Sequence, residues 1–123
     1  MDLLLSIIYP TLMRVNGIIK LLRTPRCRWD REKILEELNA AAEALTDVRY
    51  QGKYLQSINE VREDIFDLRY LIRCNVTKPL KELRLRAKHI RLGLIGISDG
   101  YNTTENPRKV AQAAASIRHS TPA

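Results

Sequence analysis

The sequence predicts an all-α protein, an up-down-up-down four-helix bundle followed by a disordered C-terminal tail. Apolar residues recur at spacings of three and four along several long segments, which is the period of an amphipathic helix. Only five Gly and five Pro occur among 123 residues, and they fall mainly between these segments. The connections are short, as in antiparallel bundles. We therefore predict one bundle over residues 1–97 and a flexible polar tail over residues 98–123.

The first two helices are predicted over residues 2–23 and from residue 30 onward. Apolar residues cover a wide arc of the first helix, which indicates burial on more than one side, including against another subunit. Pro10 is expected to kink this helix or to mark where its regular part begins. Asp30 suits the N-cap of the second helix, and Gly52 is predicted to cap its C-terminus.

The third and fourth helices are predicted over residues 57–74 and 77–97. Ser57 and Glu60 match a capping box, although the pattern allows a start one turn earlier. Thr77 is the expected N-cap of the last helix, with Pro79 in its first turn. The core stripes are expected at Ile58, Val61, Ile65, Leu68 and Ile72, and at Leu80, Leu83, Ala87, Ile90, Leu94 and Ile97.

The formal net charge of +7 favours a polyanionic partner. A basic protein that is merely soluble and one that binds an acidic lipid surface are the alternatives. The apolar N-terminal segment lacks a basic region before it and is a poor signal peptide. No apolar run approaches the roughly 20 residues of a membrane span, so we expect no membrane partner. Cys27 and Cys74 lie far apart in the sequence without metal-ligand spacing, which argues against a zinc site. One disulfide between them is the alternative to the simpler expectation of two free thiols in a reducing cytoplasm.

Basic residues are concentrated on the last predicted helix. Lys81, Arg84, Lys88 and Arg91 recur at three and four residues, so they form one stripe beside the core stripe. On the third helix, arginines share a face with Phe66. The candidate nucleic-acid-binding residues are Arg69, Arg73, Lys78, Lys81, Arg84, Arg86, Lys88 and Arg91. A second candidate patch surrounds Trp29 and comprises Arg23, Arg26, Arg28 and Arg31.

Structural interpretations of both groups remain open. The stripe on the last helix can be a solvated face that pairs with the carboxylates of neighbouring helices, and Trp29 can be a plug of the core. The sequence shows no phosphate-binding glycine loop, no nucleophile elbow and no metal-ligand spacing around His89 or His119. We therefore expect no catalytic site, no metal and no cofactor.

Three stretches of the chain resemble one protein family. They are Val48-Arg49-Tyr50 followed by Lys53, Asp67-Leu68-Arg69-Tyr70-Leu71-Ile72-Arg73, and Ile90-Arg91-Leu92-Gly93-Leu94-Ile95-Gly96. Together with the length and the basic charge, they resemble the four-helix-bundle accessory variability protein (Avd) of diversity-generating retroelements. The resemblance covers roughly residues 3–97. The chain departs from the family pattern in lacking a Trp at the end of the last helix.

The resemblance implies a homo-pentamer whose basic surface contacts RNA or DNA and whose partner is a reverse transcriptase. It implies a role in mutagenic copying, with the chemistry belonging to the reverse transcriptase. The family's basic positions map onto Arg69, Arg73 and Arg91. The competing hypothesis is a helical interaction adaptor of a phage or mobile element, whose basic face docks an acidic protein.

Overall fold

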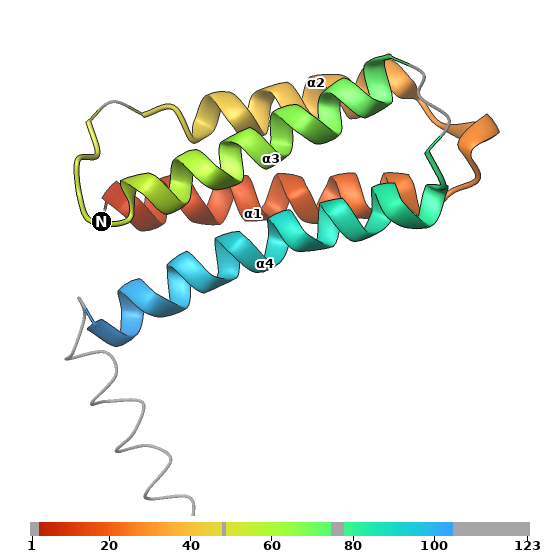
Figure 1. Ribbon diagram of the computed structural model, residues 1–123. Coiled ribbons are helices and arrows are strands. Elements are labelled where there is room, and N and C mark those ends of the chain that lie inside the picture. Colours follow the sequence, from red (N-terminus) through yellow and green to blue (C-terminus); the bar gives the residue numbers. More distant parts are fainter. Residues whose placement is uncertain (1–2, 48, 75–77, 105–123) are drawn as a thin grey trace, which may run out of the picture.

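The computed structural model describes residues 3–47, 49–74 and 78–104, and these form the predicted helical bundle (Figure 1). Its helices are α1 (Leu3–Leu22), α2 (Arg31–Ala44), α3 (Leu55–Arg73) and α4 (Leu80–Thr104). One turn of 3-10 helix, η1 (Arg26–Arg28), lies between α1 and α2. Extensive contacts join α1 to α2 and α4, and α3 to the same two helices. The bundle is antiparallel, and α1 lies diagonally opposite α3.

The core is one cluster of aliphatic side chains contributed by all of these helices. The stripe predicted for α3 is buried throughout, and that of α4 is buried from Leu83 to Ile97, while Leu80 is half-buried. The aromatic rings of Trp29, Tyr50, Tyr54 and Tyr101 pack only against the margin of the cluster. Burying one such aliphatic side chain contributes about 1.5–3 kcal/mol, so the repeated stripes account for the four-helix arrangement.

α1 runs unbroken through Pro10, so this residue does not mark the start of the regular helix. The wide apolar arc is explained by contact with both α2 and α4. The sequence-based expectation that no apolar run reaches the length of a membrane span is wrong for α1, which is long and apolar enough by length and composition. Here, however, the buried residues of α1 belong to the core of the bundle. A helix in the core of a soluble protein can be just as long and apolar as a membrane span.

α2 begins as predicted, because the Asp30 side chain accepts a hydrogen bond from the backbone N–H of Lys33 at 3.2 Å. It ends at Ala44, so the prediction that Gly52 caps this helix is wrong. Gly52 instead makes room for the Tyr50 ring, since a Cβ on Gly52 would lie 2.3 Å from the Tyr50 hydroxyl oxygen. Val48 and Thr77 lie outside the described residues.

The connection between α2 and α3 is organised by a local ion pair. The Arg49 guanidinium contacts the Asp47 carboxylate at 2.6 Å, and the backbone N–H of Arg49 donates to the same carboxylate at 3.0 Å. The side-chain hydrogen bond from Arg49 is the main reason that the pKa of Asp47 falls to about 2, from a usual value of 3.8. Because the folded-state pKa is the lower one, this contribution to stability is present above about pH 4 and is lost as the pH falls towards 2.

α3 begins at Leu55, so Ser57 lies inside the helix and the predicted capping box is not its N-terminus. The N-cap is Tyr54, which makes no side-chain cap; its backbone N–H donates instead to the Tyr50 hydroxyl at 3.2 Å. The earlier start therefore depends on an aromatic ring in the connection, which the capping pattern does not reveal.

α4 extends to Thr104, beyond the boundary predicted at residue 97. Ser98 is buried, and the Tyr101 ring meets the Tyr54 ring edge-on, with centroids 6.3 Å apart. These contacts give residues 98–101 a packed side and the helix continues to Thr104, so the prediction that residues 98–104 belong to the tail is wrong. The rest of that predicted tail, residues 105–123, lies outside the described residues.

Among the glycines of α4, Gly93 lies at the closest contact with α3. A Cβ on Gly93 would lie 2.9 Å from a methyl carbon of Val61, whereas one on Gly96 would meet nothing within 4 Å. Valine is stiff about its first side-chain torsion, so it yields little. Gly93 therefore permits the close approach of α3 and α4, whereas Gly96 has no such role.

This difference predicts opposite effects for two alanine substitutions one turn apart. Gly96→Ala should raise the free energy of unfolding by about 0.5–1 kcal/mol, because alanine favours the helix. Gly93→Ala should lie at least about 1 kcal/mol below Gly96→Ala, because the added methyl overpacks the contact with Val61. Urea unfolding followed by circular dichroism measures both. Equal stabilisation by the two variants would contradict the close approach at Gly93.

Candidate nucleic-acid interface

Hydrogen bonds between α1 and α4 fix how these two helices lie side by side. Arg84 on α4 donates through Nε to the Leu22 carbonyl at 2.7 Å, and through a terminal nitrogen to the Arg23 carbonyl at 2.8 Å. Towards the other end, the Ser98 hydroxyl contacts the Tyr9 hydroxyl at 3.5 Å. This antiparallel register places the outer cations of both helices on one surface. We call it the α1–α4 basic face; it comprises Arg23, Lys81, Lys88 and Arg91, whereas Lys20 lines a groove between α1 and α2 together with Lys33 and Glu37.

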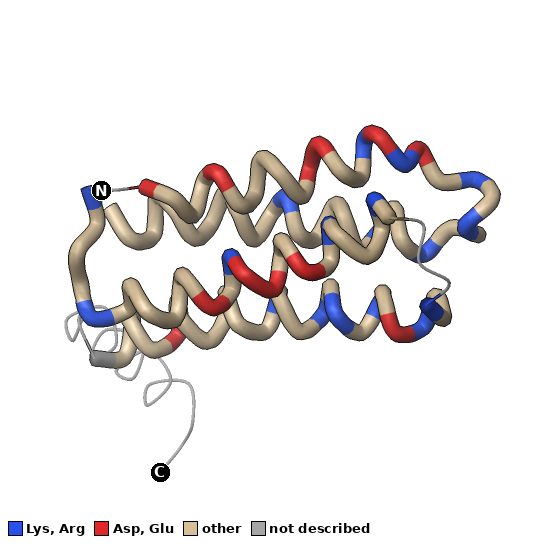
Figure 2. The backbone as a smooth tube through the Cα atoms, turned by 45° about the horizontal axis from the view of Figure 1, so that its top comes forward, with Lys and Arg blue, Asp and Glu red and all other residues tan. Residues whose placement is uncertain are grey.

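The charges of the bundle are segregated between its helices. No Asp or Glu occurs between residues 3 and 29, and Glu82 is the sole acidic residue of α4 before Asp99. Acidic residues instead follow α2 and α3, as Figure 2 shows. Because the described helices order themselves as α1, α2, α3, α4 around the bundle, the acidic pair lies opposite the α1–α4 basic face. The surface potential is therefore expected to be positive on one side of the bundle.

Two of the predicted site arginines hold the helices together. The last carbonyls of a helix have no partner within it, and Arg84 supplies one at the C-terminus of α1. Arg31 does the same for α3: it donates through Nε to the Ile72 carbonyl at 3.0 Å and through a terminal nitrogen to the Arg73 carbonyl at 3.1 Å. Both side chains are half-buried. Their donors are directed largely at backbone, so they are poorly placed to bind phosphate.

The predicted patch around Trp29 is also partly structural. The indole N–H of Trp29 donates to the Thr24 carbonyl at 3.0 Å, and its ring packs against the core. Arg26 lies over this ring, 5.5 Å from the centroid, and donates to the Lys78 carbonyl at 2.5 Å. Trp29 thus covers one end of the bundle at the margin of the core and does not plug its interior. Of this patch, Arg23 and Arg28 remain exposed with no side-chain contact among the described residues.

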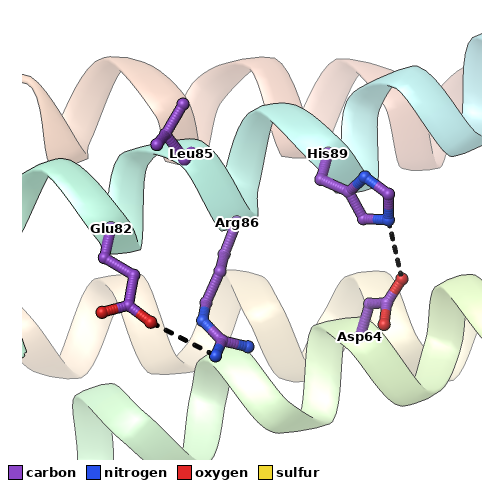
Figure 3. Close-up of a pocket in the computed structure, with 5 residues that line it drawn as sticks. All are labelled: Asp64, Glu82, Leu85, Arg86 and His89. Carbon is purple, nitrogen blue, oxygen red and sulfur yellow. Dashed lines mark hydrogen bonds and ion pairs between the residues drawn. The ribbon is translucent and has the colours of Figure 1, made fainter.

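A groove of about 310 Å³ between α3 and α4 contains charges of both signs (Figure 3). Arg86 contacts Glu82 at 3.4 Å, and Lys78 contacts the same carboxylate at 3.8 Å. Across the groove, Nε2 of His89 lies 3.8 Å from an oxygen of Asp64, an ion pair when the imidazole is protonated. Lys78 and Arg86 are therefore already paired. This groove does not favour an anion.

Lys81, Lys88 and Arg91 form no ion pair within residues 3–47, 49–74 and 78–104. The alternative in which neighbouring helices neutralise the stripe required carboxylates of α2 or α3 to reach it. Asp64 alone among those carboxylates contacts α4 in the described structure, and it does so through His89, on the side that faces α3. These three cations consequently remain available to an external anion.

Arg69 and Arg73 lie on a different face from the α4 stripe. The row to which they belong points towards α2, as the contact at 3.5 Å between Arg62 and the Thr46 hydroxyl shows. Arg73 is exposed, while Arg69 is half-buried and its Nε is enclosed without a hydrogen-bond partner in the described structure. The predicted site residues are thus spread over the α1–α4 side, the α3–α4 groove and the α2–α3 side, and they do not form one site.

The contribution of α1 to the basic surface is the part that sequence reasoning missed. Arg23, which was predicted in the patch around Trp29, lies at the end of α1 beside α4, and the signal was the absence of carboxylates from residues 3–29. Cys27 and Cys74 are exposed free thiols. Within the part of the chain that the structure describes, no three His, Cys, Asp or Glu side chains are grouped to hold a metal ion.

Comparisons with protein-family models, curated proteins and solved structures found no match to this chain.

Some basic residues of α4 hold the helices together and others are only exposed, so alanine substitutions in the two groups should differ in their effect on stability. Arg84→Ala should lower the free energy of unfolding by about 1–3 kcal/mol, since two charge-assisted hydrogen bonds to the end of α1 are lost. Lys88→Ala should change it by no more than about 0.5 kcal/mol, because this side chain is exposed and unpaired. Urea unfolding of the two variants compares them directly, and equal stabilities would refute the structural role of Arg84.

Proposed function

We propose that this chain is a non-catalytic accessory protein that binds RNA or DNA through the α1–α4 basic face. The observation that carries the proposal is the set of unpaired cations on a side of the bundle that has almost no carboxylates. Lys81, Lys88 and Arg91 are at helical spacing on α4, and Arg23 follows the adjacent end of α1. Cations in such an arrangement bind phosphates with little dependence on sequence and release counterions as they do so.

The biological setting rests on the sequence resemblance. Similarity to the accessory variability protein of diversity-generating retroelements supports a reverse transcriptase as the protein partner, a homo-pentamer as the assembly and mutagenic retrohoming as the process. In that setting the bundle contributes binding and the reverse transcriptase contributes the chemistry.

One observation favours a second candidate function, that of an adaptor docking an acidic protein. Leu85 and Leu92 on α4 are 55% and 61% exposed, and Met13 on α1 is 74% exposed. Apolar side chains among cations add little to phosphate binding and contribute strongly at protein interfaces. In this candidate function the cations meet carboxylates, and nucleic acid does not bind at physiological salt.

Titration with labelled duplex DNA and structured RNA at several salt concentrations tests the proposal. We expect sub-micromolar affinity at low salt that falls as salt rises, with a log–log slope no steeper than about −4 if all four cations of the face contact phosphates. Light scattering on the same sample reports the number of subunits. Absence of binding even at low salt would refute the nucleic-acid function and favour the adaptor.

Charge reversal localises the binding. The triple variant Lys81→Glu, Lys88→Glu and Arg91→Glu should abolish measurable duplex binding while the helical content stays unchanged, because none of the three side chains holds the fold together. Lys88→Glu alone should weaken binding at least several-fold. Lys33→Glu, an exposed reversal on α2, is its matched control and should have a much smaller effect. Equal effects of the two single reversals would argue against a localised face.

A further inference from the structure

The side of α3 that borders α2 has arginines and aromatic rings in one array. Arg62, Phe66, Arg69 and Arg73 follow at spacings of four, three and four, so they lie along one line of the helix. Tyr70 lies beside this line, four residues after Phe66 and three before Arg73. We call these five residues the arginine–aromatic row. It belongs to the face of the bundle opposite the α1–α4 basic face.

The two rings of this row are exposed although the core of the bundle is closed. Phe66 is 44% exposed and Tyr70 is 63% exposed, and neither ring belongs to the core cluster or packs against its margin. Isolated exposed apolar residues are common on proteins. Two exposed aromatic rings one helical turn apart, set among cations, instead offer flat surfaces to a partner with rings of its own.

The arginines of the row keep donors available. Neither Arg69 nor Arg73 forms an ion pair in the described parts of the chain, and the side chain of Arg62 makes one long contact, with Thr46. The nearest carboxylates along α3 do not neutralise them. Glu63 is one residue from Arg62 and Asp67 is two from Arg69, spacings at which side chains do not face each other. Both carboxylates lie three residues before a ring, Phe66 and Tyr70, so they border the row on its outer side without pairing with its arginines.

We propose that the arginine–aromatic row binds an unpaired, single-stranded segment of nucleic acid. Bases stack on Phe66 and Tyr70, and the phosphates on either side contact Arg62, Arg69 and Arg73. Stacking on aromatic rings accepts any base, and the planar guanidinium can hold two phosphate oxygens. This inference rests on the proposed nucleic-acid function and assigns a particular form of nucleic acid to a second face.

The chemistry of the row favours a single strand over a duplex. A duplex keeps its bases stacked on each other and presents no open base surface to Phe66 or Tyr70. The acidic residues of α2, among them Glu32 and Glu43, also reduce the long-range attraction of a highly charged duplex to this face. Rings on successive turns lie about 5–6 Å apart at their Cβ atoms, which suits neighbouring bases of an extended strand.

Fluorescence anisotropy with a labelled, unstructured oligothymidylate tests the proposal in the full chain. Because a single strand also meets the α1–α4 basic face, the triple reversal of Lys81, Lys88 and Arg91 serves as the background. In it we expect duplex binding to be lost and single-strand binding to remain, with a log–log salt slope near −2 for three phosphate contacts. Adding Phe66→Ala and Tyr70→Ala should then weaken single-strand binding by about 30-fold or more.

Two controls make the result specific. Leu85→Ala with Leu92→Ala removes a comparable exposed apolar pair from α4 and should leave single-strand binding unchanged. Tryptophan in place of alanine at the same two positions, Phe66→Trp with Tyr70→Trp, should keep single-strand binding, because tryptophan also stacks on bases. Circular dichroism confirms that each variant remains helical.

The outcomes separate this proposal from the function on which it rests. If the wild-type chain binds duplex but the triple reversal binds no single strand, or if alanine at Phe66 and Tyr70 leaves its single-strand affinity unchanged, the row is not a nucleic-acid site. Its rings are then left to a protein partner or a second copy of the chain. If neither nucleic acid binds the wild-type chain, both the proposed function and this inference are refuted.

Discussion

Burial of one aliphatic stripe from each helix is the constraint on which the rest of this bundle depends. The stripes determine which side of each helix faces inward, and the antiparallel packing then determines which residues become neighbours. Burial of Leu83, Ala87 and Ile90 fixes which side of α4 faces the core. As a result Arg84 reaches the end of α1 on one side of this helix, and Gly93 contacts Val61 of α3 on the other. Every surface described above is in this sense a consequence of the apolar spacing.

This dependence explains why much of the fold was predictable from the sequence and why several details were not. Helical periodicity identified the core of α3 residue by residue, since it is a local property of one helix. The beginning of α3 and the end of α4 depend on Tyr50, Tyr54 and Tyr101, which lie in different parts of the chain. Local capping patterns do not contain such contacts, so Gly52 and the capping box were misinterpreted.

The candidate site illustrates the same limit more sharply. Spacing placed Arg84 and Lys88 in one stripe, and the structure agrees that both lie on the side of α4 towards α1. What spacing could not show is that Arg84 is directed at the carbonyls of α1 while Lys88 extends into solvent. Charge on a helix predicts where cations are; only the neighbouring backbone determines which of them are already engaged.

The segregation of charge across the bundle has a consequence for the kinetics of encounter. With cations along α1 and α4 and carboxylates along α2 and α3, the molecule has an electric dipole across its short axis. A polyanion would turn such a molecule before touching it, so that productive collisions begin with the α1–α4 basic face already facing the ligand. Salt would then act chiefly by slowing association, because it screens the field that performs this orientation.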